Sequence, residues 1–307
     1  MPLSAGTNAA MNPIMYRGDD LNDFQNVVAG GTARLEVRNG FMYHEIQVEY
    51  AGVTVAQMTE VRVKLNNQVY YRLRGSDLDV IEFYDGGLDS DSVGILVIPF
   101  SRKGLKVPGQ EVLTALNMQV PDGSGNLFTN LTVEIDIAGD AAAPVLTPIA
   151  LKQPADLSLG ASGAPVGPGY VRRLIDFTQG SVHQGVNRLR DLVIPGQVVA
   201  SRLLLNRLFL NIDPAHVRNI QVRRDNVEEE YIRPRVNERN QRANGKQPVA
   251  GWTIIDPTAQ GIGLNGFDFS TRIDELEFNL DLQPIPNGAA LPASFRFIAD
   301  FIGLPTQ

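Results

Sequence analysis

The chain has 307 residues, of which 43% are apolar and 20% charged, so it can bury substantial cores and is not disordered by composition. Its formal net charge of −7 argues against a protein that coats nucleic-acid phosphates, and we expect no specific nucleic-acid partner. The absence of cysteine excludes disulfides, thiol catalysis and thiolate metal sites. The chain does not open with a basic segment followed by an apolar core, and no run approaches the ~18 apolar residues of a membrane-spanning helix. We therefore expect a protein that is soluble, or peripheral to a membrane at most.

Residues 1–31 precede the first strand-like segment, and most of them show neither strand nor helix periodicity. A free tail of this kind offsets its ordering entropy only when apolar side chains find a surface to dock on. We expect an N-terminal arm that docks through a small set of apolar side chains: Met11, Ile14, Met15 and Tyr16, assisted by Leu21 and Phe24.

Residues 32–138 carry the alternation typical of half-buried strands, clearest where Val133, Ile135 and Ile137 alternate with Glu134 and Asp136. The predicted strands are 32–38, 43–51, 60–66, 69–74, 93–100, 112–120 and 128–137. Short helices are predicted at 54–58 and at 76–84, the second with Ser76 as its N-cap. We predict that this region forms the first jelly roll.

Within it, the segment LDSDSVG (88–94) places Asp89 and Asp91 at metal-ligand spacing, with Asp85 upstream. The segment lacks the glycine and the closing glutamate of an EF-hand loop. A solvated turn is the simpler interpretation, and a weak Ca²⁺ site at Asp89 and Asp91 is the alternative. No other cofactor is expected.

Residues 139–169 are rich in Ala, Pro and Gly and nearly uncharged, which predicts an extended linker. Residues 170–307 then repeat the strand-like pattern as a second jelly roll. Its predicted strands are 186–194, 200–211, 218–224, 229–235, 251–255, 275–282 and 293–302, with a short helix at 213–217. The run 223–246 carries seven basic and five acidic residues, for which a solvated loop and a contact between neighbouring molecules both remain open.

The second region repeats the first in sequence. Residues 219–235 (NIQVRRDNVEEEYIRPR) match residues 60–76 (EVRVKLNNQVYYRLRGS) at an offset of 159, which pairs Val61 with Ile220 and Val63 with Val222. Further matches pair Asn117 and Met118 with Asn279 and Leu280, at an offset of 162. A last match pairs Asp136 with Asp300, at an offset of 164. Together with the strand patterns, these matches predict an all-β protein of two tandem eight-stranded jelly rolls, a double jelly roll with short helices in its loops.

Two stretches resemble a known family. The segments YHEIQVEYAGVTVAQMTEVRVKL (43–65) and EIDIAGDAAAPVLTPIA (134–150) resemble the major capsid proteins of corticovirus-type phages, which are tailless icosahedral bacteriophages with an internal membrane. These proteins are double jelly rolls of the adenovirus-like capsid lineage, and no catalytic motif comes with the resemblance. It implies a structural protein that is not an enzyme.

The resemblance also implies partners and a location. The expected unit is a homotrimer of pseudo-hexagonal outline, which contacts neighbouring trimers, a penton or vertex protein, and the inner viral membrane or its proteins. The arm would lie on the membrane side. The protein would be made in the bacterial host cytoplasm and reside in the virion capsid. The alternative is a tandem jelly-roll carbohydrate-binding protein or a glycan amidase. A glycan-binding surface of either kind would use aromatic side chains such as tryptophan, and the chain contains one tryptophan, Trp252.

Overall fold

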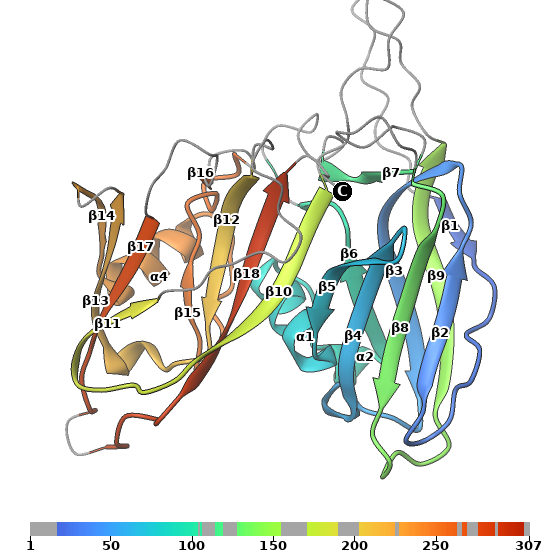
Figure 1. Cartoon of the computed structure of the whole chain (residues 1–307), viewed down its shortest axis with the longest axis horizontal. Helices are drawn as coiled ribbons and strands as arrows, with labels where there is room; N and C mark the ends of the chain where they lie inside the picture. The colour runs from blue at the N-terminus through green and yellow to red at the C-terminus, as the bar shows by residue number, and fades with distance from the viewer. Residues whose placement is uncertain are drawn as a thin grey trace, which may run out of the picture.

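The computed structural model describes residues 17–103, 105, 114–118, 128–154, 171–189, 203–224, 227–262, 266–268, 276–285 and 288–303. These residues form two jelly rolls that lie side by side along the long axis of the molecule (Figure 1). Among them, no helix is long and apolar enough to cross a membrane.

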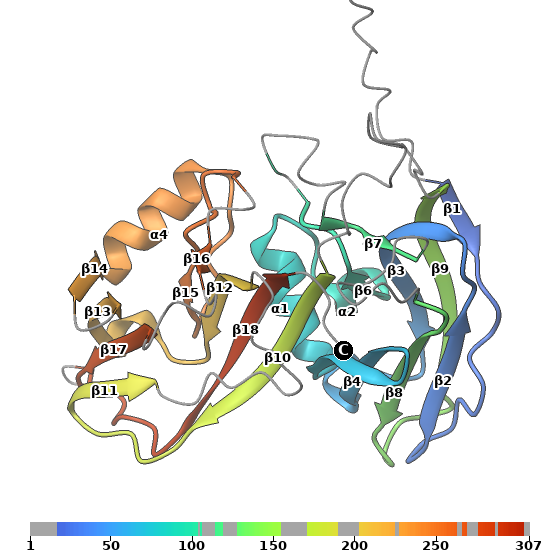
Figure 2. The same ribbon diagram turned by 45° about the horizontal axis from the view of Figure 1, so that its top comes forward.

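The first jelly roll consists of two facing sheets (Figure 2). One sheet has the order β1 (Arg17–Asp20), β9 (Val145–Pro154), β3 (Phe41–Ala51) and β6 (Ile95–Pro99), and the short strand β7 (Leu116–Asn117) also pairs with β3. The other sheet has the order β2 (Thr32–Val37), β8 (Leu131–Ile137), β4 (Met58–Leu65) and β5 (Gln68–Leu73).

The second jelly roll repeats this order strand for strand. One sheet has the order β10 (Val171–Gln179), β18 (Phe295–Gly303), β12 (Leu203–Leu210) and β15 (Thr253–Ile255), and the short strand β16 (Phe267–Asp268) pairs with β12. The other has the order β11 (Gly185–Leu189), β17 (Leu276–Leu282), β13 (Val217–Arg224) and β14 (Val227–Ile232). Each strand of the first jelly roll therefore has its equivalent nine strands later. The predicted double jelly roll is confirmed.

The helices repeat as well. The 3₁₀ turn η1 (Val55–Gln57) precedes β4, and helix α1 (Gly75–Tyr84) follows β5. In the second jelly roll, η2 (Pro214–His216) precedes β13, and helix α4 (Pro234–Ala243) follows β14. The helices predicted at 54–58, 76–84 and 213–217 are thus present. The N-cap of α1 is Arg74 and not Ser76, because the Asp77 carboxylate accepts a hydrogen bond from the Arg74 backbone N–H at 3.0 Å.

The sequence match at an offset of 159 residues joins equivalent positions in the structure. Val61 and Val63 are buried on β4, and Ile220 and Val222 are buried on the equivalent β13. The register of the following hairpin shifts at equivalent points, between Val63 and Lys64 in one copy and between Val222 and Arg223 in the other. Such shared bulges are inherited features of a duplicated fold.

The two later matches are wrong. Asn117 lies on β7 whereas Asn279 lies on β17, and Asp136 lies on β8 whereas Asp300 lies on β18. Neither match joins equivalent strands, because the equivalent of β7 is β16 and the equivalent of β8 is β17. Alternating apolar residues are common to every half-buried strand, so a short alternating match cannot tell one strand from another.

The predicted limits of the first jelly roll also need correction. Residues 17–20 of the predicted arm form β1, and residues 145–154 of the predicted linker form β9, which lies between β1 and β3. Prolines made this segment look like a linker, but Leu146 and Ala150 point into the core. The first jelly roll therefore spans 17–154, and residues 155–170 lie outside the described residues.

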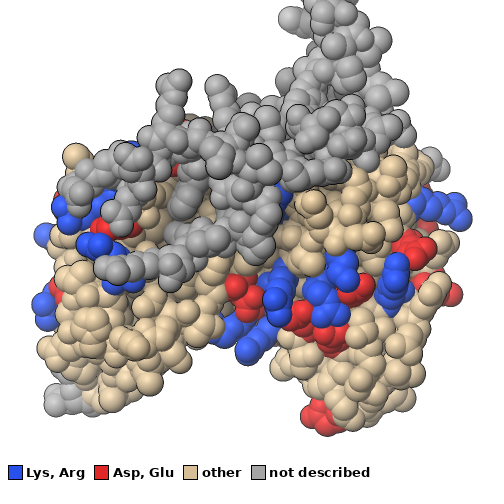
Figure 3. All heavy atoms as spheres, viewed as in Figure 1, with Lys and Arg blue, Asp and Glu red and all other residues tan. Residues whose placement is uncertain are grey.

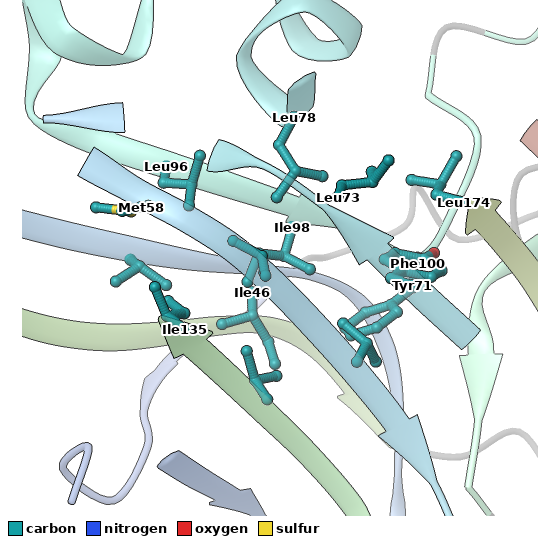
Figure 4. Close-up of a cluster of buried hydrophobic side chains, with 14 of the residues drawn as sticks. Ile46, Met58, Tyr71, Leu73, Leu78, Leu96, Ile98, Phe100, Ile135 and Leu174 are labelled. Atoms are coloured by element: carbon teal, nitrogen blue, oxygen red, sulfur yellow. The ribbon is translucent and has the colours of Figure 1, made fainter. Parts of the chain in front are cut away.

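The core of the first jelly roll continues into the second. Leu174 of β10 lies beside Tyr71 and Phe100 (Figure 4), and Phe209 and Ile298 belong to the same buried cluster. Strand β18 is therefore buried on both faces, with Phe297 and Phe301 in the core of its own jelly roll. The alternation of Phe295, Phe297 and Phe301 with Arg296 and Asp300 is typical of a half-buried strand with its polar residues facing water. Asp300 is instead fully buried, because the first jelly roll covers that face.

Candidate functional site: the interface between the jelly rolls

The two jelly rolls share one continuous sheet. Strand β5 of the first pairs in parallel with β10 of the second, with Tyr71 opposite Leu174 and Arg72 opposite Ile175. This pairing joins two four-stranded sheets, and with β16 the combined sheet has nine strands. The backbone groups at the edge of β5 are thereby hydrogen-bonded instead of exposed. We call this pairing the β5–β10 joint.

A buried ion network lies behind the joint, centred on Asp300 of β18. Its carboxylate accepts hydrogen bonds from Arg172 of β10 at 2.8 and 3.0 Å and from Arg207 of β12 at 2.7 Å. Arg102, which follows β6 in the first jelly roll, approaches the same carboxylate at 3.3 Å. All four side chains are at most 1% exposed. One carboxylate thus holds three guanidinium groups from both jelly rolls.

A second carboxylate extends the network from the first jelly roll into the second. Asp85, which follows α1, accepts hydrogen bonds from Arg207 at 2.8 Å and from Lys246 at 2.7 Å. The neighbouring Tyr84 hydroxyl donates to Asp256 of the second jelly roll at 3.0 Å. Every one of these contacts crosses between the jelly rolls, so the network fixes their relative placement.

The electrostatics of the network favour the charged forms of its acids. Burial alone would raise the pKa of Asp300, but Arg172, Arg207 and Arg102 outweigh it and lower that pKa well below its usual range. Burial likewise opposes ionisation of Asp85, yet Arg207 and Lys246 hold its pKa far below its usual value. Both carboxylates are therefore ionised at neutral pH.

Charged side chains also line the exposed face beside the joint. Arg62 of β4 contacts Glu134 at 3.0 Å and Asp136 at 2.7 Å, and Lys64 contacts Glu134 at 2.7 Å. Figure 3 shows acidic and basic side chains alternating across this face. At the boundary of the jelly rolls, Arg296 of the second bridges Asp77 of the first at 2.7 Å and Asp176 at 2.9 Å. Removing one partner of such a partly exposed pair costs less than removing one partner of the buried network.

The predicted calcium residues cap a short helix. Asp89 is the N-cap of α2 (Ser90–Val93) and accepts a hydrogen bond from the Asp91 backbone N–H at 3.2 Å. The Asp91 carboxylate accepts hydrogen bonds from the Tyr50 hydroxyl at 2.8 Å and from the Val55 N–H at 3.0 Å. Asp89 therefore caps α2, and Asp91 ties α2 to Tyr50 and to the start of η1. The described part of the chain contains no group of three or more acidic or histidine side chains placed to hold a metal ion, and calcium stays a prediction.

The remaining predicted features lie in two places. Met11, Ile14, Met15 and Tyr16 lie outside the described residues, so the docking of the arm stays a prediction. Most of the described residues of the charged run 223–246 form the end of β13, strand β14 and helix α4 and not a loop.

Sequence reasoning missed the ion network, although a signal for it exists. The apolar runs LLLNRLFL (203–210) and FRFIADFIG (295–303) are each too apolar for a strand with one wet face, and Arg207 and Asp300 interrupt them. A lone charge inside a strand that is otherwise apolar on both faces indicates a buried partner of opposite sign.

Solved structures define the class of the fold. The chain is similar to the major capsid protein P2 of bacteriophage PM2, with a TM-score of 0.74 at 22% identity over 95% of this chain and 99% of that chain. It is also similar to the PBCV-1 virus capsid protein (TM-score 0.61, 10% identity, 94% of each chain) and to a protein of Sulfolobus Turreted Icosahedral Virus (0.56, 12% identity, 94% of this chain and 90% of that one). The fold is that of the double jelly-roll viral capsid proteins. No curated protein matches the chain in sequence.

Family models identify the particular family. The N-terminal domain model of viral coat protein P2 matches residues 19–154, and the C-terminal domain model matches residues 171–293. The chain therefore belongs to the viral coat protein P2 family. It is a major capsid protein that assembles with copies of itself in the virion capsid. The match indicates no enzymatic family and does not favour a carbohydrate-binding protein or an amidase.

The buried network predicts a large cost for removing its central acid. Asp300→Ala would leave the buried guanidinium groups of Arg172 and Arg102 without their carboxylate partner and Arg207 with Asp85 alone, and the free energy of unfolding should fall by about 3–5 kcal/mol. Asp136→Ala is the matched control, because Asp136 also binds an arginine but is partly exposed, and it should cost about 1 kcal/mol or less. Chemical denaturation at one protein concentration measures both. Equal losses would contradict the assigned role of Asp300.

The lowered pKa values predict loss of stability in acid. An acid whose pKa is lower in the folded than in the unfolded chain stabilises the fold above its unfolded pKa, about 3.9 for Asp, and that contribution is lost as the pH falls further. The denaturation midpoint should therefore drop between about pH 4 and pH 2. In Asp300→Asn this drop should be shallower, although the variant is less stable at pH 7. An unchanged slope would contradict a lowered pKa of Asp300 in the folded chain.

Proposed function

We propose that three copies of the chain form a capsomer of pseudo-hexagonal outline that tiles an icosahedral shell above an internal membrane. The observation that carries the proposal is the pairing of two jelly rolls with identical strand order in one chain, joined by a continuous sheet and a buried ion network. Three such chains supply six similar domains around one axis.

The physical reason is geometric. Head-to-tail contacts between copies generate a closed ring when successive rotations complete a full turn, and a ring of six like domains has six similar sides. Such a unit can contact six neighbours in a facet through similar surfaces. The inter-domain network supports this role, because a lattice transmits load only if its domains keep their relative placement.

The proposal includes the finer partners and the place of synthesis. The protein would be made in the cytoplasm of a bacterial host, and the capsomers would contact a penton or vertex protein and the inner membrane or its proteins. Residues 1–16 precede β1 and carry the apolar side chains Met11, Ile14, Met15 and Tyr16. We assign this arm to the membrane side of the capsomer.

The native mass tests the capsomer. The chain has a mass of 33.5 kDa, so a trimer has a mass of about 100 kDa, three times that value. Obligate interfaces typically bury more than ~2,000 Å², so the trimer should persist on dilution to nanomolar concentration. Native mass spectrometry and light scattering measure this. A folded monomer would contradict the proposal.

The arm is tested by deletion of residues 1–16, which leaves β1 in place. The deletion should preserve the trimer and impair particle assembly or particle stability, since the arm would lose its docking side chains. Electron microscopy of particles beside the native mass of the free protein separates these effects. Normal particles of normal stability would contradict a role for the arm.

A further inference from the structure

Among the strands that end a sheet in the described part of the chain, β14 and β1 are the equivalents of the two strands that form the β5–β10 joint. Strand β14 ends the order β11-β17-β13-β14, and β1 ends the order β1-β9-β3-β6. They lie at opposite ends of the molecule (Figure 1). Residues Val227 to Tyr231 of β14 are all exposed, with Val227 at 66% and Tyr231 at 45%. An edge strand with exposed backbone groups is a ready surface for another strand.

The internal repeat shows which strand fits each edge. Strand β14 is the equivalent of β5, and β1 is the equivalent of β10. Inside the chain, β5 and β10 form the parallel joint between the jelly rolls. The chain therefore carries a second, unused copy of each half of that joint.

Shared bulges place the residues of the two joints in register. In the second jelly roll the register of β12 and β18 shifts after Leu205 and resumes at Arg207 opposite Asp300, which in turn lies opposite Leu174 of β10. In the first jelly roll the register of β3 and β9 shifts after Tyr43 and resumes at Glu45 opposite Leu151. Leu151 lies opposite Gly18 of β1. Gly18 is thus the equivalent of Leu174, and Asp19 the equivalent of Ile175.

The equivalents on the other edge follow from the sequence match. The 159-residue offset makes Glu230 and Tyr231 of β14 the equivalents of Tyr71 and Arg72 of β5.

We propose that β14 of one copy pairs in parallel with β1 of the next copy, with Glu230 opposite Gly18 and Tyr231 opposite Asp19. This inference rests on the proposed trimer and specifies its interface. Each ring then contains six joints of one kind: three β5–β10 joints within chains and three β14–β1 joints between chains.

Charge at the joint supports the pairing. Within the chain, the Arg173 guanidinium lies 4.5 Å from the centre of the Tyr70 ring. The register-equivalent positions between chains are Arg17 and Glu229. These two positions carry residues of opposite charge in the sequence. Glu229 also contacts Arg224 of its own chain, and a carboxylate has acceptor sites for both.

A second contact follows from the same equivalence. In the chain, α1 packs on the outer face of the β18–β12 sheet, where Tyr84 meets Phe209 with ring centres 5.5 Å apart. The equivalent helix α4 presents exposed Arg239 and Arg242, and the equivalent face of β9 and β3 presents exposed Glu49 beside half-buried side chains. Exposed arginines and an exposed glutamate therefore lie on the two surfaces that come together when β14 pairs with β1.

Engineered cysteines test the pairing directly, because the natural chain contains none. The double variant Asp19→Cys with Tyr231→Cys places one thiol on each edge at directly opposed positions, within the range that a disulfide spans. Oxidation should yield chains linked in twos and threes on a denaturing gel. Each single variant should stay monomeric on that gel, because neither edge meets its own copy. The matched control Ile175→Cys with Arg72→Cys occupies the equivalent positions of the β5–β10 joint and should close a disulfide within one chain.

The outcomes separate this inference from the proposed function. If the native mass is that of a trimer, the control pair closes and the double variant gives no linked chains, another surface joins the copies and the β14–β1 joint is wrong. If the native mass is that of a monomer, the proposed capsomer itself fails. A ladder that extends beyond three chains would support the joint and contradict the closed ring. The adjacent pair Gly18→Cys with Glu230→Cys provides the second test should the first variant fail to fold.

Discussion

The contact between the buried Asp300 carboxylate and three guanidinium groups is the interaction on which the arrangement of the molecule depends. Two domains in one chain move relative to each other by default unless their interface is large and apolar. Here the interface is apolar, and it also encloses charges that cannot be separated without leaving arginines unpaired in a medium of low dielectric. Any hinge motion at the β5–β10 joint would break Arg102 and Asp85 away from their partners in the second jelly roll. The two jelly rolls are therefore one unit for the purposes of assembly.

The network also distinguishes the two halves of the duplication. Asp300 and Arg207 have as their equivalents Leu151 and Glu45, so the first jelly roll does not carry the same ion cluster on its outer face. The ion cluster is therefore formed at the interface between the two jelly rolls of one chain. The equivalent face of β9 and β3, which is available to a neighbouring copy, has different side chains. This divergence lets one backbone geometry serve two contacts while the internal and external partners remain distinct. Buried charges are weak evidence for added stability. They favour one relative position of the two jelly rolls, because other positions would leave a charge without its partner.

The sequence predicted the architecture well where patterns were local. Alternation on β4 and β13 and the 159-residue match identified equivalent strands, because each hairpin and the helix after it form from neighbouring residues. It failed where burial depends on distant elements. Strand β9 contains Pro148 and has the composition of a linker, and the local alternation around Asp300 does not show that the first jelly roll covers it. The spacing of Asp89 and Asp91 is compatible with a metal site and with structural hydrogen bonds, and the structure shows the second, whereas calcium binding stays a prediction. The local sequence does not indicate a role for the acidic residues of β14, and the pairing proposed for this strand follows from its equivalence with β5.

The central claim is that one joint, formed within the chain, repeats between chains. Image reconstruction of the assembled capsomer at a resolution that separates strands measures it most directly. The rotation that carries the first jelly roll onto the second within a chain should equal the rotation that carries the second onto the first of the next chain, about 60° each for a ring of six. The map should also show β14 beside β1 of the neighbouring copy. Clearly unequal rotations, with β14 facing solvent or another element, would contradict the account.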